Sequence, residues 1–130
     1  MSMSNLKTVL IVDAITCTGV LALGLFALKP VAALLGLPLA VVTIGAWICL
    51  AAAIPMFLAA AQRVPNPALV KLIAVGNIGW VAASLGVVAT FGAAMTGIGI
   101  IVMLAQAVAV LAFAIIEWKG AGTGGRTATA

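Results

Sequence analysis

Four apolar stretches, each long enough to cross the hydrocarbon core of a membrane, constrain the fold of this chain more than any other feature. They cover residues 6–28, 39–61, 68–90 and 95–118. A hydrocarbon layer of about 30 Å needs about 20 residues of helix. Only 6% of the 130 residues are charged and the mean hydropathy is +1.41, whereas soluble domains are about 25% charged. The sequence predicts an all-α polytopic membrane protein.

The domain organisation follows from these stretches. Residues 1–119 are expected to form one domain, a bundle of four transmembrane helices. Residues 120–130 are rich in Gly, Thr and Ala, and we expect a disordered cytoplasmic tail there. Between the first two stretches, residues 30–38 are bracketed by prolines and too short to cross, which predicts a loop or a short helix at the interface. Asn66 before Pro67 is typical of a helix start.

The basic residues predict the orientation of the bundle. Four spans place both ends of the chain on the same side of the membrane. The side of the termini carries five of the six basic residues, and the opposite side carries only Lys29; the five are Lys7, Arg63, Lys71, Lys119 and Arg126. This bias predicts that both termini are cytoplasmic. Because the basic residues are scattered, they do not indicate a nucleic-acid partner.

The composition also argues against several chemistries. The chain has no histidine, the residue that most often serves as a metal ligand, haem ligand or general base. Cys17 and Cys49 form no CxxC pair, and we expect free thiols that pack in the helices. No nucleophile has an evident base. The sequence therefore predicts no metal, no cofactor and no enzymatic activity.

Polar residues inside the spans are the candidate functional residues. A rise of about 1.5 Å per residue places the Asp13, Asn77 and Gln106 side chains at similar depths. The Ala51 carbonyl, freed where Pro55 breaks the helical hydrogen-bonding pattern and kinks the helix, lies at the same level. We therefore predict one polar layer shared by four helices. Trp80 and Ser84 follow Asn77 on one helical face, and the indoles of Trp80 and Trp47 are expected to seek acceptors in the same interior.

Three interpretations of Asp13 stay open. It belongs to a hydrogen-bonded seam that joins helices, or it carries a proton or binds a cation, or it forms an ion pair with Lys7 or Lys71 that extends toward it. Glu117, next to Lys119 at the end of the last span, is expected to be a solvated interfacial charge.

The two halves of the chain match loosely. Asp13 in the first span sits where Asn77 sits in the third. A duplication of two spans gives parallel repeats related by an axis along the membrane normal. The fold expected is therefore a four-helix bundle with a two-plus-two parallel repeat.

Several short motifs resemble a group of small four-span bacterial membrane proteins without a characterised activity. The motifs are residues 34–38 (LLGLP), residues 77–81 (NIGWV) with Ser84, and residues 104–107 (LAQA) with Phe113 and Glu117. The resemblance covers roughly residues 6–119, and it implies the four-helix fold, a bacterial inner membrane and no activity. Small multidrug-resistance transporters also carry one acidic residue in the first of four spans, but their third-span pattern is missing here. The third-span signature of fluoride channels is missing as well.

Two functions are compatible with these residues. The first is a non-enzymatic helical module in the lipid bilayer, which self-associates or serves as an accessory subunit of a larger membrane complex. The alternative is a small proton- or cation-coupled transporter or channel in which Asp13 titrates and Asn77, Gln106 and the Pro55 kink surround the pathway.

Overall fold

Five helices account for nearly all of the described chain. The computed structural model describes residues 2–129, with side chains described as far as residue 122. Its elements are α1 (Met3–Phe26), α2 (Leu28–Leu35), α3 (Leu39–Ala61), α4 (Pro67–Phe91) and α5 (Gly97–Thr129). Four of them are long and apolar enough to cross a membrane, and residues 2–129 contain no strand. The predicted all-α four-helix membrane bundle is confirmed.

The ends of the helices follow local chemistry. The Asn66 side chain accepts hydrogen bonds from the backbone N–H groups of Ala68 and Leu69, and Pro67 occupies the first turn, as predicted. The predicted short helix is α2, which begins at Leu28, two residues before Pro30. It ends at Gly36, whose φ of 70° is left-handed, a conformation that glycine adopts without a side-chain clash.

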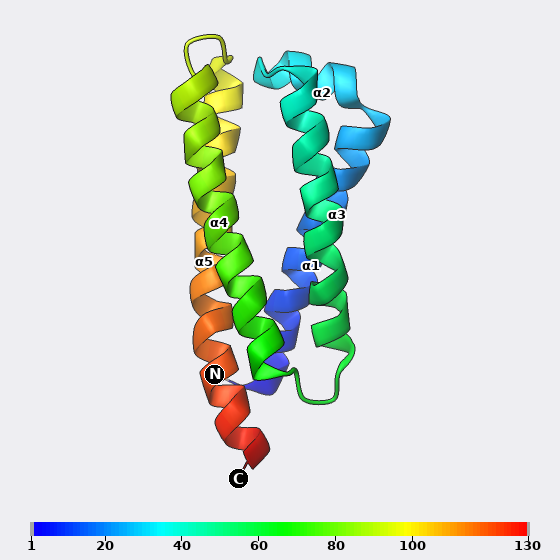
Figure 1. Ribbon diagram of the computed structural model, residues 1–130, viewed down its shortest axis with the longest axis vertical. Helices are drawn as coiled ribbons and strands as arrows, with labels where there is room; N and C mark the ends of the chain where they lie inside the picture. The colour runs from blue at the N-terminus through cyan, green and yellow to red at the C-terminus, as the bar shows by residue number, and fades with distance from the viewer. Residues whose placement is uncertain (1, 130) are drawn as a thin grey trace.

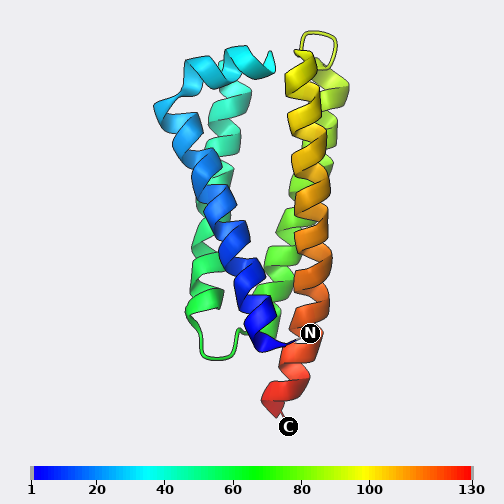
Figure 2. The same cartoon turned by 180° about the vertical axis from the view of Figure 1, so that it is seen from behind.

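The bundle consists of two helix pairs, which correspond to the two halves of the sequence. α1 packs most extensively on α3, and α4 on α5, while α1 touches α5 and α3 touches α4 less extensively. The backbones of α1 and α4 lie diagonally across the bundle and make no contact with each other. Figures 1 and 2 show the pairs close together near the termini and wider apart toward α2. A two-plus-two repeat would place α1 and α4 on opposite sides of its axis in this way.

The end of the bundle near the termini holds the main apolar core. All four long helices contribute to it, with the residues Leu6, Leu10, Ala14, Met56, Ala59, Val70, Ile73 and Ala121. Higher in the first pair, Gly24 of α1 lies against Ala46 of α3, where a Cβ on Gly24 would be only 2.5 Å from the Ala46 Cβ. A close contact of small residues therefore holds the first pair, and the core that joins the two pairs is concentrated at one end.

The opposite end is closed by contacts between the end of α2 and the start of α5. The Thr96 backbone N–H donates to the Leu35 carbonyl at 3.2 Å, and the Thr96 hydroxyl donates to the Leu34 carbonyl. Gly99 lies so close to the Leu35 carbonyl that a Cβ there would overlap it. Because α2 belongs to the first pair and α5 to the second, these contacts join the pairs away from the termini.

The last helix is longer than predicted. α5 continues to Thr129, whereas the sequence predicted a disordered tail over residues 120–130, of which Ala130 lies outside the described residues. Extending a helix that has already formed adds one hydrogen bond per residue without a new nucleation cost. This continuation also moves Glu117 away from the end of its helix.

Candidate functional site

Three buried polar side chains meet where the two helix pairs come together. Asn77 Nδ2 donates to Asp13 Oδ2 at 2.6 Å and to Glu117 Oε1 at 3.1 Å. The exposed fractions of Asp13, Asn77 and Glu117 are 1%, 5% and 0%. The two hydrogens of one amide group thus serve two carboxyl groups, and we call these three residues the carboxyl triad.

The bundle geometry explains why Asp13 and Asn77 meet. Each lies ten residues after the first residue of its helix, Met3 in α1 and Pro67 in α4. At about 1.5 Å per residue, both side chains are therefore about 15 Å from the helix start. Their helices are diagonal, so the side chains reach each other through the centre of the bundle. The predicted proximity of Asp13 and Asn77 in depth is borne out by this hydrogen bond.

For Glu117, the third member of the carboxyl triad, the environment predicted from the sequence was wrong. Glu117 was expected to be a solvated charge at the membrane edge, but it is fully buried against Asn77. The prediction took residue 118 as the end of the last span, whereas the apolar part of α5 continues to Gly122. The one available signal was its spacing of eleven residues from Gln106, which puts both side chains on the same helical face.

Glu117 also carries the one unsatisfied buried side-chain atom among the described residues, Oε2. Its carboxyl group lies within interaction range of the Asp13 carboxyl group. A buried acceptor without a donor costs about 1–3 kcal/mol, and more if it is charged. One further proton between the two carboxyl groups would therefore give the unsatisfied Glu117 oxygen a hydrogen bond.

Neither candidate lysine neutralises the triad. Lys71 Nζ lies 5.2 Å from the centroid of the Trp118 ring, a cation–π contact on the outer side of the bundle. In the part of the chain that the structure describes, Asp13 has Asn77 as its hydrogen-bond partner and forms no ion pair with Lys7 or Lys71. The ion-pair interpretation of Asp13 is therefore wrong for this structure.

A second polar group lies farther from the termini. Trp80 Nε1 donates to Gln106 Oε1 at 2.7 Å, while Gln106 Nε2 donates to Ser84 Oγ at 2.9 Å and to the Met103 carbonyl at 2.9 Å. Ser84 in turn donates to the Trp80 carbonyl. The Trp80 ring lies beside Gly45 of α3. We call Trp80, Ser84 and Gln106 the amide cluster.

The single polar layer predicted from the sequence is therefore two layers. The prediction estimated depth from the span ends and did not include the register between the antiparallel helices α4 and α5. In that register Gln106 lies beside Trp80 and Ser84, and Glu117 rather than Gln106 lies beside Asn77. Among the described residues, no other helix donates a side-chain hydrogen bond to the Ala51 carbonyl beside Pro55. Trp47 is 53% exposed and faces outward, so its indole does not join the interior.

The cysteines lie near the triad but do not enlarge it into a metal site. Cys17 and Cys49 are free thiols that interact with each other across α1 and α3. Over the described ranges, no group of three or more His, Cys, Asp or Glu side chains is arranged to hold a metal ion. The chemistry that the geometry offers is the holding and release of a proton by paired carboxyl groups.

Comparisons of the chain with protein-family models, with curated proteins and with solved structures give no match.

Proposed function

We propose that the protein is a small proton-coupled membrane transport module in which the carboxyl triad holds the coupling proton. The observation that carries the proposal is the pair of buried carboxyl groups joined by one amide. Hydrogen bonds between membrane helices contribute only about 0.6 kcal/mol on average, and neutral amides or hydroxyls supply them at lower desolvation cost than two carboxyl groups. A seam that only joined helices would not need this pair.

The presence of a bound proton follows from the repulsion between the two carboxyl groups of the triad. Two carboxylates that share one donor in a water-poor interior repel each other, so they do not both stay ionised, and one proton is held between them. Glu117 Oε2, which has no hydrogen-bond partner among the described side chains, is the acceptor available to that proton. Loss of the proton would leave two negative charges on a single bridging amide.

The position of the triad couples the proton to the arrangement of the helices. Asp13 belongs to the first pair, whereas Asn77 and Glu117 belong to the second. With the proton bound, the pairs attract each other through hydrogen bonds; without it, carboxylates on opposite pairs repel. Binding and release of one proton would therefore shift the equilibrium between closed and separated pairs.

Reconstitution into liposomes that contain a pH-sensitive dye tests the proposal. A pH gradient is imposed with valinomycin and potassium to collapse the membrane potential, and proton flux is compared for the wild type, Asp13→Asn and Glu117→Gln. We expect both variants to lose flux. Ser84→Ala is the matched control, since Ser84 is also buried but belongs to the amide cluster, and it should retain flux. Equal flux in the wild type and both carboxyl variants would contradict the proposal.

We also propose that the termini face the cytoplasm of a bacterial inner membrane. Both ends of the described chain lie at the same end of the bundle (Figure 1), and the bias of basic residues toward that end supports this orientation. Reporter fusions at the C-terminus and after Lys29 test it. Activity of a cytoplasmic reporter at the Lys29 position alone would reverse the orientation.

A second candidate function, a self-associating or accessory helical module, is favoured by the amide cluster. Each polar side chain of that cluster finds its partner within the chain, as expected for a group that only fixes helix packing. Pull-down and oligomeric state in mild detergent, compared for Asp13→Asn and Gln106→Ala, separate the two functions. Loss of assembly in Gln106→Ala, with no proton flux in the wild type, would favour the module.

A further inference from the structure

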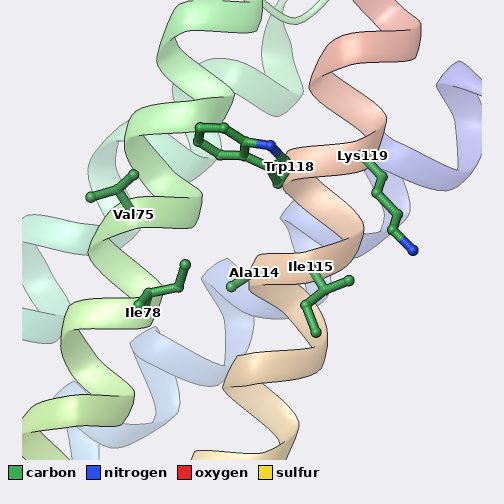
Figure 3. Close-up of a pocket in the computed structure, with 6 residues that line it drawn as sticks. All are labelled: Val75, Ile78, Ala114, Ile115, Trp118 and Lys119. Atoms are coloured by element: carbon green, nitrogen blue, oxygen red, sulfur yellow. The ribbon is translucent and has the colours of Figure 1, made fainter.

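An apolar groove runs along the outer side of the second helix pair. Near the termini it has a volume of about 390 Å³ and is lined by Val75 and Ile78 of α4 and by Ala114, Ile115, Trp118 and Lys119 of α5. Figure 3 shows Trp118 extending from α5 toward α4 above Ala114 and Ile115, and Lys119 pointing away from α4. The groove therefore has an aromatic and basic end and an apolar interior.

The apolar surface continues farther along the same two helices. A second groove, of about 370 Å³, is lined by Val81, Leu85, Leu104, Ala107, Val108 and Leu111. On α5 the lining residues 104, 108, 111, 115 and 118 recur every three or four positions, which places them on one helical face. From residue 104 to residue 118 this face is about 21 Å long, more than half of a hydrocarbon layer of about 30 Å.

The positive charge gathers at one end of this face. Lys71 is exposed and its ammonium group is held 5.2 Å from the Trp118 ring centroid, and Lys119 lines the same end of the groove. Lys71 lies four residues after the start of α4 at Pro67, about 6 Å along the helix. This is the level at which lysine and tryptophan side chains meet lipid headgroups.

We propose that this groove binds an anionic phospholipid of the leaflet on the side of the termini, with an acyl chain along the α4–α5 face and the phosphate at Lys71. The polarity of the groove matches that of the lipid, apolar along its length and positive at one end. A second copy of the chain fits less well, because its two acidic side chains, Asp13 and Glu117, are both buried. It would offer no carboxylate side chain to Lys71.

Native mass spectrometry of the full chain in mild detergent tests the site. Phosphatidylglycerol and phosphatidylcholine with identical acyl chains are titrated separately, and the apparent Kd of the first bound lipid is measured. We expect the wild type to prefer phosphatidylglycerol. Lys71→Gln should weaken binding of phosphatidylglycerol about fivefold, the effect of one lysine at an anionic surface, and leave phosphatidylcholine unchanged. Lys29→Gln, with the same change of charge at the opposite end, is the control and should retain the preference.

A second variant tests the groove itself. Ile115→Trp adds bulk on its floor, and we expect weaker binding of both lipids with an unchanged oligomeric state. Equal affinity of the wild type for the two lipids would overturn the proposal, as would equal losses in Lys71→Gln and Lys29→Gln. Dissociation of an oligomer by Ile115→Trp, without a change in lipid binding, would also overturn it and assign the groove to a second copy. None of these results depends on proton transport.

Discussion

Removal of the bridging amide in Asn77→Ala tests whether the triad contains a charged acceptor. The variant deletes two buried hydrogen bonds, to Asp13 and to Glu117. If both were ordinary hydrogen bonds between membrane helices, the loss would be about 1.2 kcal/mol, twice the average of about 0.6 kcal/mol. With one proton shared by the pair, one acceptor is ionised, and its hydrogen bond contributes about 1.5–3 kcal/mol. We therefore expect a loss of about 2–4 kcal/mol in the free energy of unfolding.

The assay is reversible unfolding in mixed micelles as the mole fraction of sodium dodecyl sulfate rises, followed by circular dichroism. A double-mutant cycle with Asp13→Ala isolates the coupling between the two side chains, which should exceed about 1 kcal/mol for groups in one network. Ser84→Ala is the control, since Ser84 is 4% exposed and should cost about 0.6 kcal/mol. A loss in Asn77→Ala no larger than that of the control, with no coupling to Asp13, would refute the charged triad.

Two further predictions concern the amide cluster and the contact between α2 and α5. Trp80→Phe keeps an aromatic ring but removes the indole N–H that donates to Gln106. In the same assay we expect the free energy of unfolding to fall by about 0.6–1.7 kcal/mol. An unchanged free energy of unfolding would mean that this hydrogen bond of 2.7 Å does not contribute to stability. Gly99→Ala should destabilise the bundle by about 1–3 kcal/mol, because the added Cβ would overlap the Leu35 carbonyl. The control is Gly97→Ala, whose added Cβ meets nothing within 4 Å and which should be neutral or stabilising. Similar effects of the two substitutions on stability would contradict the close approach of Gly99 to Leu35.

The architecture could be predicted because hydropathy alone determines it. An apolar helix in lipid satisfies its own backbone hydrogen bonds, so four long apolar stretches leave few alternatives to a helical bundle. Asp13 and Asn77 could be singled out for the complementary reason that polar side chains are costly in such helices. Their similar depth followed from their distances to the predicted span starts at residues 6 and 68, which are seven and nine residues away.

Glu117 and the division into two layers could not be predicted in the same way. Whether Glu117 is buried depends on how far the other helices continue to pack around α5. The nearby Lys119 made residue 117 resemble the end of a span. The partner of Gln106 depends on the register between α4 and α5, which is determined by the packing of whole helix faces. The outward direction of Trp47 has the same origin, since rotation of α3 about its axis is a property of the bundle.

The contact between Leu35 and Gly99 has a mechanical consequence for the opposite end of the bundle. Glu117 lies eighteen residues along α5 from Gly99, so the distance between them is about 27 Å. If the second pair rotates as a rigid body about this contact, a rotation of about 5° displaces Glu117 by about 2 Å. The hydrogen bond of 3.1 Å from Asn77 moves with the second pair, whereas the bond of 2.6 Å to Asp13 is stretched beyond its range. A small tilt at a backbone pivot is thus enough to separate the two carboxyl groups.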